Sequence, residues 1–136
     1  MYWPAPGNNI ISSPFGYRSS GFHGGTDIWG YGCLGKPVIA AASGTVIKAQ
    51  SMHYSYGNFV MIDHGLDSAG RRIVTLYAHM RYSPSVSVGQ SVTGGSTQLG
   101  VIGNTGESYG AHLHFEVRVN NTRVDAVGNG YIARPR

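Results

Sequence analysis

The sequence predicts an all-β protein with a single domain, on the basis of three observations. Of the 136 residues, 21 are glycine and six are proline, whereas only 12% are charged, which is typical of a turn-rich β protein and not of a helical bundle. Short apolar runs recur between glycine-containing turns, and none has the 3.6-residue period of an amphipathic helix. The length suits one domain with a hydrophobic core and is short for two.

The first residues predict an irregular lead-in over 1–12, because Pro4, Pro6 and Gly7 interrupt any regular element before a short strand around Ile10. Residues 13–18 predict a turn that delivers Tyr17, whose hydroxyl lies either over a site or within a packed loop. Two glycines between His23 and Asp27 argue against a helix, so we expect a loop or tight turn that enters a strand at 27–29.

The middle and end of the chain predict a series of short strands separated by turns. Residues 57–64 and 72–79 form a hairpin around a turn at 69–71, and a last strand closes the sheet. The remaining expected strands cover residues 36–42, 44–49, 87–92, 98–103, 112–119 and 123–127. With no linker or low-complexity run, residues 1–136 are expected to form one domain, with a β core at 13–128 and a tail at 129–136.

The stretch from His112 to Val117 alternates between histidine or acid and apolar side chains. A strand with this pattern places His112, His114 and Glu116 on one face and the apolar residues on the other. Neighbouring imidazoles on that face have Cα atoms about 6–7 Å apart, so one can bind a metal while the other acts on a water or substrate. Taken alone, the pattern fits a solvated histidine pair equally well.

The six histidines separate into two groups. His53 lies in an aromatic loop, where we expect it at the surface or lining a groove, and His64 at a strand end is expected to make a structural hydrogen bond. The others, with Asp27, come from three separated segments and offer ligands for one site. A catalytic zinc uses three protein ligands and an open position. The five candidates His23, Asp27, His79, His112 and His114 therefore suffice for three ligands and two outer catalytic groups.

Composition excludes several other classes of protein. The net charge of +4 fits attraction to an anionic polymer such as a cell wall, but the basic residues are scattered, so we predict no nucleic-acid binding. The single cysteine, Cys33, rules out an intramolecular disulfide and is expected to be a small loop or core residue. No run reaches transmembrane length, so we expect no membrane insertion, and the N-terminus lacks a signal-peptide pattern.

The motifs and their order resemble the lysostaphin-type, or LytM-like, zinc endopeptidases, which cut peptide cross-links in bacterial peptidoglycan. The resemblance covers most of the chain, and each piece is short, but their joint presence in this order is specific. The matching segments are residues 13–18 (SPFGYR), 23–28 (HGGTDI), 37–46, 60–65 (VMIDHG), 77–80 (YAHM), 103–106 (GNTG) and 112–117 (HLHFEV).

The resemblance implies a two-sheet antiparallel β fold, a duplicated hybrid motif with its site in a groove between loops. It implies that His23, Asp27 and His114 hold one Zn²⁺ per chain. A metal-activated water would attack the scissile carbonyl, with His112 as general base, His79 supporting the oxyanion or the leaving amine, and Tyr17 adding a hydrogen bond to the tetrahedral intermediate. Glu116 would either accept a hydrogen bond from a ligand histidine or be a solvated or strand-pairing residue.

The resemblance also implies a location outside the cell or in the cell wall, reached by cleavage of a longer precursor, by lysis or on a phage particle. The implied partner is a short stem or bridge peptide of peptidoglycan, and we expect a monomer because no long apolar face or coiled-coil pattern is present. Ala111 replaces the proline usual before the histidine pair, and segments 94–98 and 68–72 depart from the family pattern, which alters the loops that choose a substrate.

Three alternatives to the endopeptidase interpretation are open at this stage. The chain could be a catalytically silent peptidoglycan-binding or activator domain of the same fold, although such a domain would be expected to lack a ligand. It could be a small β module stabilised by zinc, although structural zinc prefers four closed ligands and usually cysteines. Among enzymes, a carboxypeptidase that trims terminal D-alanine is the runner-up.

Overall fold

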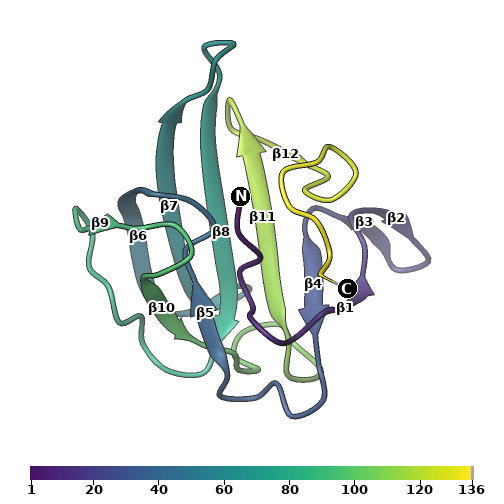
Figure 1. The fold of residues 1–136 in the computed structure, drawn as a ribbon. Helices are drawn as coiled ribbons and strands as arrows, with labels where there is room; N and C mark the ends of the chain where they lie inside the picture. Colours follow the sequence, from purple (N-terminus) through teal and green to yellow (C-terminus); the bar gives the residue numbers. More distant parts are fainter. Residues whose placement is uncertain (136) are drawn as a thin grey trace.

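The computed structural model describes residues 1–135, which contain twelve β-strands and no helix (Figure 1). The all-β prediction is therefore confirmed. The strands are β1 (Ile10–Ser13), β2 (Gly16–Arg18), β3 (Gly21–His23), β4 (Thr26–Trp29), β5 (Pro37–Ile39), β6 (Gly44–His53), β7 (Gly57–Leu66), β8 (Arg72–Met80), β9 (Ser91–Val92), β10 (Gln98–Val101), β11 (Leu113–Val119) and β12 (Thr122–Val124). No helix within the described residues is long and apolar enough to cross a membrane.

Eight strands form one antiparallel sheet in the order β1-β4-β11-β8-β7-β6-β9, and β12 pairs with β11 next to the end of β4. The strands β5 and β10 form a separate two-stranded sheet, as do β2 and β3. The predicted hairpin of β7 and β8 is confirmed, and Figure 1 shows these long strands rising together above the rest of the molecule.

The segment 13–18, predicted as a turn, instead enters a small hairpin. Tyr17 on β2 pairs with Phe22 on β3, and their rings meet edge to face with centroids 5.1 Å apart. Cross-strand aromatic pairs of this kind stabilise a hairpin. Strands of three residues are too short to give a recognisable two-residue period in the sequence, which is why the turn was predicted.

Two other predicted strands are shorter than expected because side chains form turns within them. Of the strand predicted at 87–92, only β9 forms, because residues 87–90 make a turn. The Gln90 backbone N–H donates to the Ser87 carbonyl, and the Gln90 side chain accepts from the Ser87 amide. The strand predicted at 123–127 is replaced by the shorter β12. It ends there because the Asp125 carboxylate accepts a hydrogen bond from the Gly128 amide and starts a turn.

The hydrophobic core lies on one face of the large sheet. Leu113, Phe115 and Val117 of β11 are fully buried there, which confirms the predicted alternation in this strand. Across the core lie the β5–β10 sheet and the N-terminal segment, which runs in front of the large sheet in Figure 1 and buries Ala5 completely. The opposite face of the sheet is left for polar side chains and a small cluster of Phe59, Leu76 and Ala78.

Both ends of the chain pack onto this core. Residues 1–9 contain no strand, as the irregular lead-in predicted, and the Met1 amino group donates to the Tyr131 carbonyl at 2.9 Å. Ile132 in the predicted tail is only 2% exposed. The last residue of that tail, Arg136, lies outside the described residues.

Candidate metal centre and groove

Three side chains from different strands meet on the polar face of the large sheet. His23 ends β3, Asp27 lies on β4 and His114 on β11, and the β4–β11 register places Asp27 directly opposite His114. One ligand atom from each lies within 4.8 Å of the other two, and each residue is at most 9% exposed. Strands of two sheets therefore bring together two imidazoles and one carboxylate, of which Asp27 and His114 are 87 positions apart in the chain.

The hydrogen bonds of His23 direct one ring nitrogen toward this group. Its Nδ1 lies 2.9 Å from the Pro14 carbonyl oxygen and donates to it. Its Nε2 consequently faces Asp27 Oδ1 at 3.3 Å. An unprotonated nitrogen and a carboxylate oxygen this close repel each other unless a proton or a cation lies between them.

His114 has a carboxylate at each ring nitrogen. Nδ1 lies 2.8 Å from Asp27 Oδ1, and Nε2 lies 2.8 Å from Glu116 Oε2. Burial alone would lower the pKa of His114, but hydrogen bonds to the two carboxylates outweigh it and raise the pKa to about 9. Burial alone would raise the pKa of Asp27, but hydrogen bonds from His114 and His23 hold it well below its usual range.

These residues fit a zinc ion. Neutral imidazole nitrogens and a carboxylate oxygen are donors that Zn²⁺ accepts. Without a metal, the protonated His114 ring bridges two carboxylates, and a cation can take the place of the proton on Nδ1. Glu116 would then keep the Nε2–H bond that orients the ligand ring.

The sequence leaves three roles open for Glu116, namely a hydrogen bond to a ligand histidine, exposure to solvent and cross-strand pairing. Glu116 is 1% exposed and accepts hydrogen bonds from His114, from the Tyr56 hydroxyl at 2.9 Å, and from Arg118 Nε at 3.0 Å. The solvated alternative is therefore wrong. The prediction missed Tyr56 and Arg118, although Arg118 shares the strand face of Glu116 and could have been found from that spacing.

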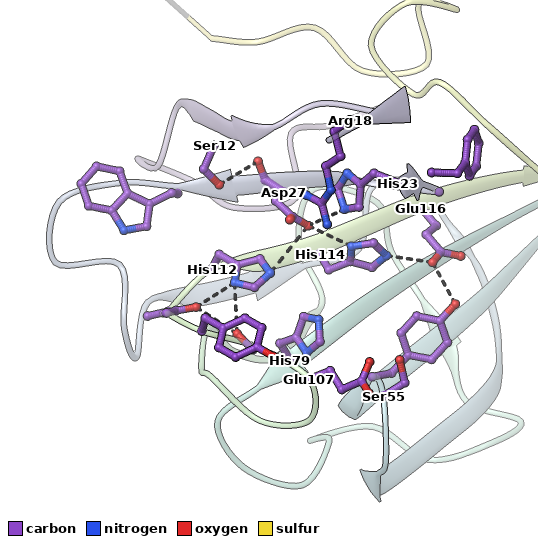
Figure 2. Close-up of a pocket in the computed structure, with 18 of the residues that line it drawn as sticks. Ser12, Arg18, His23, Asp27, Ser55, His79, Glu107, His112, His114 and Glu116 are labelled. Atoms are coloured by element: carbon purple, nitrogen blue, oxygen red, sulfur yellow. Dashed lines mark hydrogen bonds and ion pairs between the residues drawn. The ribbon is translucent and has the colours of Figure 1, made fainter. Parts of the chain in front are cut away.

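His112 and His79 lie beside the cluster with their rings 4.9 Å apart (Figure 2). His112 Nδ1 lies 2.8 Å from the Gly110 carbonyl oxygen, and its Nε2 lies 3.6 Å from Asp27 Oδ1. His79 Nδ1 lies 2.6 Å from the Thr105 carbonyl oxygen. Each ring donates Nδ1–H to a backbone carbonyl, which leaves Nε2 as a proton acceptor. Burial, with the nearby imidazoles of His112 and His114, lowers the pKa of His79 to about 4, so this ring is neutral at pH 7.

In β8 the alternation of side chains between the two faces is interrupted, and the His79 side chain therefore lies on the face of the candidate metal centre. Tyr77 and Met80 both pack into the main core, although strict alternation would place them on opposite faces of β8. His79 has a φ of +63°, in the left-handed region that is uncommon for residues with a side chain. The pairing of β7 with β8 shifts register at this point. Ala78 and His79 therefore both lie away from the main core.

Tyr17 is not brought to this cluster. Its side chain is 90% exposed on β2, where it packs against Phe22, and it is not among the residues that line the groove described below. Its catalytic role stays a prediction.

The remaining sequence candidates lie outside the cluster. His64 makes the expected structural hydrogen bonds, to the Ser43 carbonyl at 2.8 Å and the Thr75 hydroxyl at 2.7 Å. His53 stacks on Tyr54 and accepts hydrogen bonds from backbone amides of its own loop. Cys33 is buried in the core, as expected.

The cluster lies in an open groove of about 750 Å³. Its walls come from the β2–β3 hairpin and β12 on one side and from the loops at 55–56 and 107–111 on the other. The lining residues are Ser12, Arg18, Phe22, His23, Gly24, Asp27, Trp29, Ser55, Tyr56, His79, Glu107, Ser108, Tyr109, Gly110, Ala111, His112, His114, Glu116 and Arg123. The groove is open to solvent and lined mostly by polar groups.

Known proteins share both the sequence and the fold. The sequence model described as Peptidase family M23 matches residues 21–126. The DD-carboxypeptidase/endopeptidase Mpg of Neisseria meningitidis serogroup B is 40% identical over 124 residues, which cover 86% of this chain and 26% of that protein. The chain thus spans about a quarter of the length of that relative.

Two solved structures have the same fold. A zinc-containing peptidase from Vibrio cholerae superposes with a TM-score of 0.78 at 31% identity, covering 91% of this chain and 38% of the other. The catalytic domain of the antimicrobial peptidase lysostaphin from Staphylococcus simulans superposes with a TM-score of 0.71 at 28% identity, covering 87% and 89% of the two chains. The second match extends over nearly the whole of that catalytic domain.

Proposed function

Since this chain belongs to peptidase family M23, we propose that it is a zinc-dependent endopeptidase that hydrolyses peptide cross-links or stem peptides of bacterial peptidoglycan. One observation carries the proposal: the buried group of His23, Asp27 and His114 opens into a peptide-sized groove. The similarity to a relative named as a DD-carboxypeptidase/endopeptidase supports hydrolysis of peptide bonds.

His23 Nε2, Asp27 Oδ1 and His114 Nδ1 would hold one zinc ion. Three protein ligands leave a coordination position open, as in catalytic zinc sites, whereas a structural zinc would need a closed set of four. When bound, the ion would polarise the scissile carbonyl and lower the pKa of a water molecule toward about 7.

His112 is the general base in this proposal. Its Nε2 faces the cluster with a free lone pair, and the Gly110 carbonyl fixes the opposite nitrogen as the donor. This ring can take the proton of the attacking water and pass it to the leaving amine. Its position next to Leu113, the first residue of β11, gives it a rigid support.

His79 would act on the leaving amine. Stabilising an oxyanion requires a donor at Nε2, but the lowered pKa of His79 keeps that atom unprotonated at pH 7. An unprotonated Nε2 can instead accept a hydrogen bond from the N–H of the departing amide. Of the two roles that the resemblance implied for His79, the tautomer favours this one.

The alternatives differ in what they require of the site. A silent binding or activator domain needs no complete metal site, yet all five residues expected for catalysis are present. His23, His112 and His114 lie within 3.6 Å of Asp27, and the ring of His79 lies beside that of His112. A D-alanine carboxypeptidase would use the same chemistry on a terminal bond. We place the protein outside the cell or in the cell wall, acting as a monomer.

Digestion of purified peptidoglycans of different bridge types, followed by mass spectrometry of the fragments, tests the proposal. We expect peptide fragments that disappear when a chelator is added or when His114 is replaced by Ala. His53→Gln, a histidine outside the groove, is the matched control and should keep activity. Release of terminal D-alanine alone would favour the carboxypeptidase, and intact walls with one zinc bound would favour the silent domain.

A further inference from the structure

Two arginines line the groove, and neither forms an ion pair with a residue in 1–135. Arg18 comes from β2 and Arg123 from β12, and both border the same wall of the groove. In residues 1–135, the ion pairs that involve arginine are those of Arg71, Arg72 and Arg118. Arg18 and Arg123 are absent from these pairs, so the two guanidinium groups present uncompensated positive charge to the groove.

Both guanidinium groups contact neutral groups. Arg18 donates to the Ser13 hydroxyl. Arg123 lies over Gly24, where any Cβ would collide with its guanidinium group, and its Cζ is 6.0 Å from the centre of the Phe22 ring. Because Gly24 follows His23 directly, Arg123 sits next to the proposed metal ligands. None of these contacts neutralises either charge.

The opposite wall has the opposite charge. Glu107 lines the groove from the loop that follows β10 and makes no ion pair with any described residue. In Figure 2, Arg18 and Glu107 lie on either side of the histidine cluster. A peptide that crosses the cluster therefore meets positive charge along one side only.

We propose that Arg18 and Arg123 form a subsite for a free carboxylate of the peptide stem, close to the scissile bond. The proposal rests on the peptidase function above and adds to it that the enzyme selects stems whose carboxylate is not amidated. Arginine suits this task because its planar guanidinium donates two parallel hydrogen bonds to a carboxylate. A stem peptide offers two sources, a side-chain carboxylate and the terminal one.

The test uses three synthetic stem peptides that differ only in their carboxylates: all free, side chain amidated, and terminus amidated. The specificity constant kcat/KM is measured for the wild-type chain, for Arg18→Gln, for Arg123→Gln and for the double variant. Arg81→Gln is the matched control, because Arg81 lies outside the groove and packs over Tyr82. Glutamine keeps a hydrogen-bond donor and removes the charge.

We expect the wild-type chain and Arg81→Gln to prefer the free peptide over one of the amides by about tenfold or more, the range of a charge-assisted hydrogen bond. The rejected amide identifies the carboxylate that is bound. In the double variant this preference should vanish, while kcat/KM on the rejected amide stays within about threefold of wild type. Equal cleavage of all three peptides by the wild-type chain, or an equal loss on all three in the double variant, would overturn the proposal.

A binding measurement separates this proposal from the peptidase function. Fluorescent versions of the three peptides are titrated into the chain in the presence of a chelator, so that no metal binds the carboxylate. A preference in Kd for the free peptide that is lost in the double variant supports the subsite even if nothing is cleaved. Equal Kd values for all three peptides would refute the subsite even if cleavage occurs.

Discussion

At the scale of single residues, the two carboxylates around His114 make zinc binding compete with a proton. Asp27 and Glu116 each lie 2.8 Å from one ring nitrogen, and together they raise the pKa of His114 to about 9. The metal-free chain therefore holds protons on both nitrogens of this ring at neutral pH. Zinc can bind Nδ1 only after its proton leaves.

The affinity for zinc should consequently rise with pH. Below the raised pKa, each unit of pH should increase the apparent affinity by up to about tenfold, and the increase should level off above about pH 9. Competition with a zinc-binding dye between about pH 6 and 9 measures this slope. Glu116→Gln, which removes one of the two carboxylates, should lower the pKa of His114 and flatten the dependence near neutral pH. An affinity in the wild-type chain that does not change between pH 6 and 8 would contradict this account.

The two histidines of the strand pair should respond differently to replacement. His114→Ala removes a proposed ligand, so both zinc and activity should be lost. His112→Ala removes the proposed base, so zinc should stay bound at one equivalent while turnover falls by about 10²–10⁴-fold. Atomic absorption and peptide turnover on the same samples measure both quantities. Near-normal turnover of His112→Ala would show that the base is another group.

At the scale of secondary structure, regular strands were predictable and the break in β8 was not. The alternation in β11 predicted which residues face the core and which face the site, because a two-residue period follows from strand geometry alone. The same rule applied to β8 would send His79 into the core beside Tyr77. The positive φ of His79 instead turns its side chain toward the site. The ring contacts the loop at 103–106, and no local sequence pattern reveals that contact.

Thr105 holds that loop against the break in β8. Its hydroxyl donates to the Met80 carbonyl at 2.6 Å and accepts from the buried Asn58 amide at 3.0 Å, and its carbonyl accepts from His79 Nδ1. Glycine is needed at position 57, where φ is +65° and a Cβ would meet Thr105. A single residue thus links the backbone of two strands to the orientation of a proposed catalytic ring.

We therefore expect Thr105→Val to affect both stability and turnover. Valine keeps the shape but leaves the Asn58 amide without its partner, which should lower the free energy of unfolding by about 1–3 kcal/mol. The altered loop should reduce kcat and leave zinc affinity nearly unchanged, because Thr105 does not contact the metal group. Urea unfolding and steady-state kinetics measure the two effects. Thr105→Ser keeps the hydroxyl and is the control; if it behaves like the valine variant, the hydrogen bonds are not the cause.

At the scale of the whole molecule, the sequence predicted the features that depend on motifs and strand periods, namely the fold class and the family. Both were confirmed. The five histidine and aspartate candidates lie together, whereas Tyr17 lies outside their cluster. Tyr56 and Arg118 around Glu116, and Arg18 and Arg123 on the groove wall, were not predicted. Tyr56 contacts Glu116 across 60 positions of the chain, which no local sequence pattern reveals. Arg118, by contrast, could have been found from its strand spacing to Glu116.

The position of the core predicts that zinc is dispensable for folding. The main hydrophobic cluster lies on the face of the large sheet opposite to His114 and Glu116, and strand pairing holds β4 against β11 without a metal. A chelator should therefore leave the far-ultraviolet circular dichroism spectrum at 25 °C unchanged. It should lower the Tm by several degrees, because zinc at about 100 times its Kd adds about 2.7 kcal/mol to the folded state. The His114→Ala variant should show the same lower Tm with or without chelator. Loss of the β spectrum on chelation would mean that the metal is needed for the fold, and the interpretation of the chain as a zinc-stabilised structural module would then replace that of an enzyme.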